Sequence, residues 1–244
     1  IDRAENGEST CAHLVQYTVK DFATETAANT DDDYVTGQRI CTGYMHTCAI
    51  VSNTSNNIDQ LHCFGKKETQ AHPSRNAYSH PDQSYVVTLG TNQIPKYVSC
   101  SENHTCVIMT TGKVKCFGLN SRGRLNLSEV EKSYLGGNTY SGNSDGFDSN
   151  VRYPAMGDYL PFIDFGNDNG AEYRAIKIDS TYDTSCAILD DINTAEFDGI
   201  VKCWGGGETT LQSGQGYTTG TEYFGTDHGT NRLVANLPPV NVGG

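Results

Sequence analysis

The chain has 244 residues, of which 26 are Gly, 14 are Tyr and 9 are Cys, and 36% are hydrophobic. This balance favours many short strands joined by turns over long helices. The formal net charge of −12 argues against nucleic acid as a partner, and the absence of any run of about 18 apolar residues argues against membrane insertion.

Two repeated elements lie in the N-terminal third of the chain. The first is short, at residues 9–14 (STCAHL), and the second is longer, at residues 46–50 (HTCAI) and 61–65 (LHCFG). The polar residues 51–60 between the two longer runs suit a solvent-facing loop. The second element therefore predicts a hairpin in which Ile50 lies opposite Leu61.

A third element, at residues 97–118 (YVSCSENHTCVIMTTGKVKCFG), is compact enough to fix a strand register. Pairing Cys106 with Cys116 places Val107 opposite Lys115 and leaves residues 110–112 as the loop. Loops of three residues commonly end in a left-handed Gly, here Gly112. Directly opposed cysteines are within disulfide reach, so this hairpin predicts a bridge.

A fourth element follows at residues 185–188 (SCAI) and 201–205 (VKCWG), and the same rule sets Ile188 opposite Val201. Residues 69–95, 128–172 and 206–232 do not match the repeat, and we expect long loops there. The stretch 136–150 lacks apolar periodicity, and its Tyr140 and Phe147 are available for recognition.

The cysteines are interpreted as structural disulfides, because no Cys-x-x-Cys spacing is present. The hairpins predict three bridges: Cys48 with Cys63, Cys106 with Cys116 and Cys186 with Cys203. We further expect Cys11 to pair with Cys41. Cys100 would then be either a free buried thiol or a link to another chain. Bridges of this kind predict an extracellular or cell-surface location.

The recurring pattern, together with residues 119–125 (LNSRGRL), resembles the regulator of chromosome condensation repeat family in its cysteine-bearing, secreted variety. The resemblance implies an all-β, β-propeller-like repeat domain with disulfide-stapled hairpins and long loop insertions. Only four copies are visible, so the ring could be incomplete. The nucleotide exchange activity of the family's nuclear member is not carried over, because its interaction loops cannot be matched here.

We expect a single repeat domain over residues 1–244. Its units cover approximately the ranges 1–39, 40–95, 96–175 and 176–235. The tail 236–244 is interpreted as a lead strand or closing strand, because residues 238–244 (PPVNVGG) resemble residues 94–100 (IPKYVSC). Circular closure, strand donation to another molecule and a fragment of a longer protein all stay open.

Two metal sites were weighed against simpler interpretations. His46, Cys48, His62 and Cys63 could form a zinc quartet, but the position of His62 is Lys in the other hairpins while both Cys are kept. The loop ligands Asp164, Asn167, Asp168, Asn169, Gly170 and Glu172 could bind calcium, but their spacing suits a turn-rich segment better. We expect neither a metal nor a cofactor.

The sequence predicts no catalytic residues. His46 and His104 occupy equivalent places before Thr-Cys, so a repeated turn hydrogen bond explains them better than catalysis. No nucleophile elbow, phosphate loop or His-Glu-x-x-His motif occurs. We therefore expect that the protein is not an enzyme.

Three Asn residues match the glycosylation acceptor pattern. Asn53 lies in the first hairpin loop and Asn126 in an expected loop, whereas Asn103 adjoins a buried repeat turn.

The leading hypothesis for the function is an extracellular structural or adhesive module, for example a repeating unit of a filament or coat. The alternative is a soluble binding propeller, lectin-like or inhibitor-like. Expected partners are proteins, glycans or copies of the chain itself.

Overall fold

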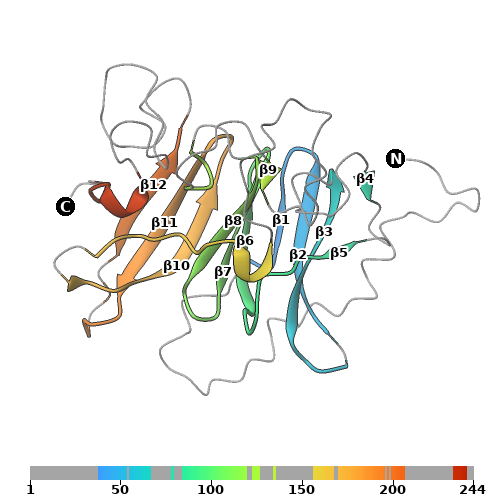
Figure 1. Cartoon of the computed structure of the whole chain (residues 1–244), viewed down its shortest axis with the longest axis horizontal. Helices are drawn as coiled ribbons and strands as arrows, with labels where there is room; N and C mark the ends of the chain where they lie inside the picture. Colours follow the sequence, from blue (N-terminus) through green and yellow to red (C-terminus); the bar gives the residue numbers. More distant parts are fainter. Residues whose placement is uncertain are drawn as a thin grey trace, which may run out of the picture.

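The computed structural model describes residues 38–53, 55–66, 78–79, 84–119, 123–126, 134–135, 156–167, 170–195, 197, 199–206 and 233–240. Over these residues the chain forms three antiparallel sheets that lie side by side in chain order (Figure 1). Two short 3-10 helices, η4 (Gly157–Tyr159) and η6 (Val234–Asn236), lie between and after the sheets. No helix in the described ranges is long and apolar enough to cross a lipid bilayer. The predicted all-β class is confirmed.

The first sheet contains β1 (Ile40–Thr42), β2 (His46–Ser52), β3 (Asp59–Lys66), β4 (Tyr78–Ser79) and β5 (Tyr85–Val86). The strands follow the order β1-β2-β3-β4, and β5 also pairs with β3. Cys48 lies opposite Cys63 and Ile50 opposite Leu61, so the predicted register of this hairpin is confirmed.

The second sheet contains β6 (Pro95–Cys100), β7 (His104–Met109), β8 (Val114–Leu119) and β9 (Tyr134–Leu135), in that order. Cys106 lies opposite Cys116 and Val107 opposite Lys115, as predicted. Gly112 closes the β7–β8 loop with a φ of 79°, which is the left-handed conformation expected for it.

The third sheet contains β10 (Tyr173–Ser180), β11 (Thr184–Asp191) and β12 (Ile200–Gly205), in that order. Cys186 lies opposite Cys203 and Ile188 opposite Val201. The three sheets therefore repeat one antiparallel unit, and their hairpins differ in the length of the connecting loop.

The second sheet is buried on both faces. Successive residues of a strand point to opposite faces. Cys106 and Ile108 of β7 pack in a core shared with the third sheet, whereas Val107 and Met109 pack in a core shared with the first. Burial on both faces explains why β7 has a continuous run of buried residues rather than an alternating pattern. Sheets that stack face to face in this way are propeller blades.

After the hairpin of each sheet, the chain returns to an equivalent position on the sheet's third strand, which is β3, β8 or β12. The backbone N–H of Val87 donates to the Leu61 carbonyl over 2.8 Å, and the N–H of Ile163 donates to the Val114 carbonyl over 2.8 Å. In the third sheet the N–H of Val240 donates to Val201 over 2.7 Å. Each acceptor lies two residues before the second cysteine of its hairpin. We call residues 86–90, 160–166 and 237–240 the return segments.

The third return segment belongs to the tail, which the sequence predicts to be a lead strand or a closing strand. In the described part of this tail, η6 and Leu237 repeat η4 and Leu160, since the N–H of Leu237 donates to Val234 just as that of Leu160 donates to Gly157. Residues 237–240 thus complete the third sheet's own unit. The division into units 1–39, 40–95, 96–175 and 176–235 stays a prediction.

Candidate functional site: the groove between the second and third sheets

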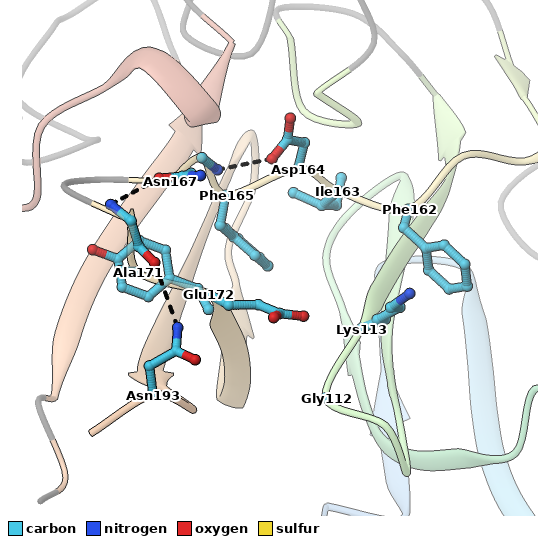
Figure 2. A pocket seen from close by; sticks show the side chains of 13 residues that line it. Gly112, Lys113, Phe162, Ile163, Asp164, Phe165, Asn167, Ala171, Glu172 and Asn193 are labelled. Carbon is cyan, nitrogen blue, oxygen red and sulfur yellow. Dashed lines mark hydrogen bonds between the residues drawn. The ribbon is translucent and has the colours of Figure 1, made fainter. Parts of the chain in front are cut away.

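A groove of about 560 Å³ lies between the second and third sheets (Figure 2). One wall is the β7–β8 turn with Gly112 and Lys113. The opposite wall is residues 170–173, which lead into β10, together with Asn193 from the β11–β12 loop. The second return segment, from Phe162 onward, spans the two walls. Three separate parts of the chain therefore build one concave surface.

Glycine at position 112 lets the two sheets approach closely at the end of the groove. The N–H of Ala175 donates to the Gly112 carbonyl over 2.9 Å. A Cβ added at Gly112 would lie 2.6 Å from the Cβ of Arg174, which is too close for any other residue. The turn that closes the β7–β8 hairpin thus also holds the start of β10.

The floor of the groove is apolar and rigidly packed. Ile163 and Phe165 of the return segment are buried. The Phe165 ring meets the Trp204 ring edge to face, with a centroid distance of 5.7 Å and an interplanar angle of 64°. Because these side chains are closely packed, the floor of the groove is preformed.

Side chains of opposite charge line the two walls of the groove. Figure 2 shows the Glu172 carboxylate directed toward the wall that carries Lys113. Both side chains are exposed. The Lys113 ammonium lies 5.3 Å from the centroid of the Phe162 ring, a cation–π distance. The groove therefore offers one acidic group, one basic group and an aromatic face.

The loop weighed as a calcium site forms Asx turns. Asp164 Oδ1 accepts from the N–H of Gly166 over 2.9 Å, and Asn167 Oδ1 accepts from the N–H of Gly170 over 2.9 Å. These bonds are the turns that the turn-rich interpretation predicted for this segment. Asp168 and Asn169 lie outside the described residues.

Two buried lysines position the return segments, and the sequence analysis did not single them out. Lys115 Nζ donates to the carbonyls of Leu89 (2.8 Å) and Gly157 (2.7 Å), and Lys202 Nζ donates to that of Phe165 (2.8 Å). Both lysines precede the second cysteine of their hairpins, so the second and third sheets each bind the return segment of the sheet before them. Burial lowers the pKa of Lys115, an effect that nearby Asp158 opposes.

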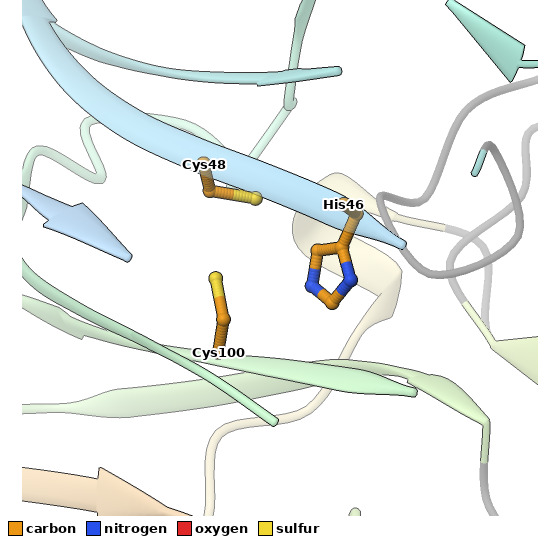
Figure 3. Close-up of side chains that lie close together, drawn as sticks. All are labelled: His46, Cys48 and Cys100. Atoms are coloured by element: carbon orange, nitrogen blue, oxygen red, sulfur yellow. The ribbon is translucent and has the colours of Figure 1, made fainter. Parts of the chain in front are cut away.

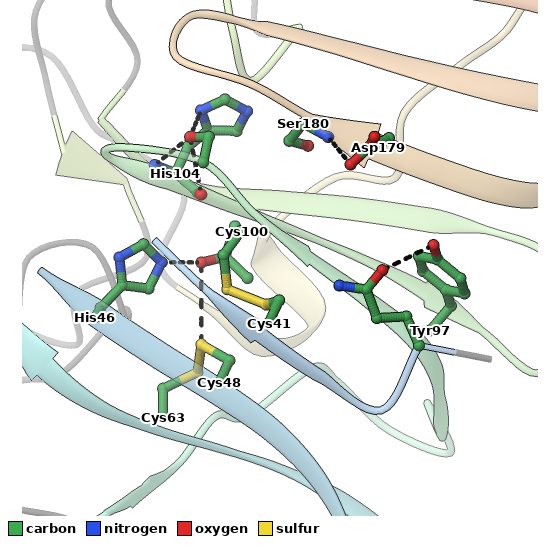
Figure 4. Close-up of a disulfide and its surroundings, with 12 residues drawn as sticks. Cys41, His46, Cys48, Cys63, Tyr97, Cys100, His104, Asp179 and Ser180 are labelled. Atoms are coloured by element: carbon green, nitrogen blue, oxygen red, sulfur yellow. Dashed lines mark hydrogen bonds between the residues drawn. A yellow bond between two sulfur atoms is a disulfide. The ribbon is translucent and has the colours of Figure 1, made fainter. Parts of the chain in front are cut away.

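The structure contains the three predicted hairpin disulfides, Cys48–Cys63, Cys106–Cys116 and Cys186–Cys203. The expectations for Cys41 and Cys100 are wrong. These two residues are bonded to each other across the first and second sheets (Figure 4). Their Cα atoms are 5.4 Å apart because the first strands of neighbouring sheets pack together. Cys11 lies outside the described residues.

The zinc quartet considered from the sequence is not assembled. Cys48 and Cys63 are bonded to each other, and the ring of His62 instead bonds the Ser84 hydroxyl over 3.2 Å. The group of possible metal ligands in the described part of the chain is a different one, His46 with Cys48 and Cys100.

The two repeat histidines bond the next sheet rather than only their own turn. His46 Nε2 lies 2.8 Å from the Thr105 hydroxyl, and His104 Nε2 lies 2.8 Å from the Ser185 hydroxyl. The turn bond predicted from the sequence is present for His104, whose Nδ1 bonds Ser101. Burial lowers the pKa of His46 to about 4, and burial, with Arg124 and His46 adding to it, holds the pKa of His104 well below its usual value.

The three glycosylation acceptors have different surroundings. Asn53 is half-buried in the β2–β3 loop, and its side chain bonds Ser55 and Gln60. Asn126 is 8% exposed and its Oδ1 accepts from the N–H of Val234, so the fold leaves little room for a sugar there. Asn103 is half-buried beside a repeat turn. Glycosylation at Asn53 stays a prediction.

Stapled hairpins, stacked sheets and an inter-sheet groove together define a β-propeller-like repeat protein. Residues 96–124 match the family model "Regulator of chromosome condensation (RCC1) repeat". The chain therefore carries an RCC1-like repeat, and the sheets on either side of it have the same hairpin register. No curated protein matches the chain.

Solved structures resemble the chain in fold. Human WBSCR16 is 19% identical, with a TM-score of 0.48 over 76% of this chain and 39% of its own. Yeast RCC1 (Prp20), solved with Kap60 bound to it, is 16% identical, with a TM-score of 0.48 over 80% of this chain and 36% of its own. The chain thus spans well under half the length of either protein.

Proposed function

We propose that this protein is an extracellular, non-catalytic binding module that recognises a glycan or protein partner through the groove between its second and third sheets. The observation that carries the proposal is the presence of two exposed charges on opposite walls of the groove, Lys113 and Glu172, together with an apolar floor. Binding sites commonly combine an apolar lining with a few placed polar groups.

The fold supports a binding role in general, because propeller-like repeats gather loops from several blades on one face. In this groove the loops are held by backbone bonds to Gly112 and Val114. A partner would therefore meet a preformed surface, which lowers the entropy cost of association.

The extracellular location is supported by the disulfides. Four bridges in the described residues join strands or sheets, and such bridges persist in oxidising compartments. A tagged chain that stays in the cytosol with reduced cysteines would contradict this part of the proposal. Glycan mass at Asn53 after secretion would support it.

The leading hypothesis from the sequence, a repeating unit of a filament or coat, is the second candidate function. One of its motives was an unpaired Cys100, and this residue is bonded to Cys41, which leaves Cys11 as the ninth cysteine of the chain. Size-exclusion chromatography with light scattering on the oxidised protein distinguishes the two, since a filament unit would give assemblies that grow with concentration.

The test of the binding role uses the oxidised full chain on a glycan array and as bait for extracellular proteins. We expect Lys113→Ala and Glu172→Ala each to weaken binding of a captured ligand about tenfold or more, as the loss of a charged hydrogen bond would. Lys177→Ala is the matched control, because Lys177 is exposed on β10 and does not line the groove. Equal binding by all three variants would rule out the groove as the site.

A further inference from the structure

Two disulfides meet where the first and second sheets pack. Possible ligand atoms of His46, Cys48 and Cys100 all lie within 4.8 Å of one another (Figure 3). The two cysteines belong to different bridges, so Cys63 and Cys41 are each one sulfur–sulfur bond away. Four sulfurs and one imidazole from two sheets thus converge on a largely buried site.

This convergence is not a general property of the repeat. At the next interface Ser99 lies opposite Cys106 just as Cys41 lies opposite Cys48. Cys100 lies opposite Thr105 in the second sheet. The equivalent residue of the third sheet is Ser180, which lies opposite Ser185. The hairpin staple is present at both interfaces, so stapling alone does not account for the additional cysteine pair.

His46 also differs from its counterpart. Nδ1 of His104 is held by Ser101, but Gly43 occupies the equivalent position in the first sheet. Nδ1 of His46 consequently has no hydrogen-bond partner, although the residue is only 3% exposed. With the proton on Nδ1, the Nε2 lone pair is directed to the side of the ring where Thr105 and the sulfurs lie.

We propose that, once both disulfides are reduced, His46, Cys48, Cys100 and Cys41 bind one Zn²⁺ ion in a tetrahedral site. Neutral imidazole and thiolate are the ligands that structural zinc prefers. Cys41 is chosen over Cys63 because it is adjacent both to Cys100, its bridge partner, and to Cys48, its strand partner.

The chemistry balances with a dithiol as the reductant. Each protein disulfide accepts two electrons and two protons, and the dithiol is oxidised to its own disulfide. Zinc then displaces the thiol protons of the three cysteine ligands, and these protons are released to solvent. Zn–S bonds of about 2.3 Å and Zn–N bonds of about 2.0 Å place the ligands of a tetrahedral ion about 3.5 to 3.8 Å from one another. The ligand atoms of His46, Cys48 and Cys100, now within 4.8 Å, would approach to that spacing, and the reduced sulfurs of Cys41 and Cys100 would separate from 2.04 Å.

Thr105 is the one obstacle that the geometry identifies. Its hydroxyl lies 2.8 Å from His46 Nε2 and 4.0 Å from Cys48 Sγ, so it contacts two of the proposed ligands. The hydroxyl must rotate away when the ion binds. Thr105→Ala should therefore retain metal binding or strengthen it, which distinguishes a metal site from a purely structural hydrogen-bond network.

The inference is independent of the proposed binding function, because the groove lies at the other face of the second sheet. In an oxidising compartment the same atoms form two bridges, and in a reducing one a metal ion would replace the covalent link between the sheets. A negative result for metal binding would therefore leave the proposed ligand binding at the groove untouched, and the reverse also holds.

The test is a Co²⁺ titration of the full chain after anaerobic reduction with dithiothreitol and removal of the reductant. We expect one Co²⁺ per reduced chain, with thiolate charge-transfer and tetrahedral ligand-field bands that Zn²⁺ abolishes, and no binding by the oxidised chain. His46→Ala and Cys100→Ser should weaken binding by more than about tenfold. The control is Cys186→Ser with Cys203→Ser, which should leave the stoichiometry unchanged.

The proposal is overturned if the reduced chain binds no Co²⁺, or if His46→Ala and Cys100→Ser bind it as tightly as the wild type. A second measurement covers variants that fail to fold. Zn²⁺ should raise the melting temperature of the reduced wild-type chain, and an unchanged melting curve would also reject the site.

Discussion

At the scale of single residues, Lys115 illustrates how a charge can stabilise an apolar interface. It is 2% exposed, and its ammonium donates to the carbonyl of Leu89, after the first sheet, and to that of Gly157, after the second, while lying 4.5 Å from the centroid of the Phe162 ring. Strand lysines usually project into solvent, so a lysine that faces a neighbouring sheet needs such acceptors to offset the loss of water.

We predict that Lys115→Met lowers the free energy of unfolding by about 3 kcal/mol, because two buried carbonyls lose their partner. Lys113→Met, a change of the same chemistry at an exposed position of the same hairpin, should cost less than about 0.5 kcal/mol. Urea denaturation of the oxidised proteins measures both. Similar losses in the two variants would show that Lys115 does not bind the return segments.

His46 predicts an acid-sensitive fold. Its pKa falls from 6.5 to about 4 on folding because of burial. Between these values the unfolded chain takes up a proton that the folded chain does not, so stability falls as the pH is lowered from 6.5 to 4. The loss should reach about 3 kcal/mol below pH 4. In urea denaturation, His46→Gln should show a smaller decrease over this window, and an unchanged decrease would contradict the prediction.

At the scale of the elements, a glycine follows the aromatic residue of each hairpin. Gly118 has a φ of 112°, and a Cβ added there would overlap the Asn103 carbonyl. The third strand therefore passes so close to the preceding turn that a side chain cannot fit. Gly65 and Gly205 repeat this arrangement against Met45 and Asp183.

Gly118→Ala should destabilise the protein by about 3 kcal/mol or prevent folding, since both the backbone conformation and the space are lost. The matched control is Gly170→Ala, where φ is 90° but no atom lies within 4 Å of the added Cβ. That variant should cost only about 1 kcal/mol, for the left-handed backbone alone. Thermal melting of both variants tests whether the close approach or the backbone angle dominates.

The equivalence of the interfaces predicts an engineered bridge. Ser99 and Ser180 hold the positions of Cys41 and Cys100, so Ser99→Cys with Ser180→Cys should form a disulfide between the second and third sheets. We expect about 2 to 4 kcal/mol of stabilisation. Non-reducing peptide mapping identifies the bridge, and each single variant is a control. Two free thiols in the double variant would refute the equivalence.

At the scale of the whole molecule, Cys41–Cys100 is a bridge that couples sheets rather than strands. Replacing both residues with Ser should lower stability by about 2 to 4 kcal/mol, because the linked loop is long. Ligand affinity of the groove should not change, since the groove is built by the other two sheets. Melting curves and binding isotherms of the same sample test the two statements together.

The sequence predicted the features that depend on one hairpin alone, namely its strand pairing, its register and its disulfide. The cysteine spacing and Gly112 defined strand pairing, and the register observed for Cys106 and Cys116 agrees. The partner of Cys41 could not be found in this way, because it depends on how two sheets pack. The same is true of Lys115, whose acceptors lie on a segment far along the chain.

The sequence carries a signal for two of the return segments. Residues 160–166 (LPFIDFG) and 237–243 (LPPVNVG) share a Leu-Pro start and alternating apolar positions that end in Gly. The groove itself could not be predicted, because its walls come from three segments whose proximity only the packed sheets establish.

In each described unit the chain returns to an equivalent backbone carbonyl, so the sheets can stay the same while the loops vary. Residues 62–86, 115–162 and 202–239 span very different lengths between the same two hydrogen-bonded positions. Because these positions are fixed at both ends, the part of each stretch that lies beyond the strands can be lengthened or changed without changing the sheets. Such a scaffold can diversify its surface much as an antibody does, keeping the frame and varying what the frame displays.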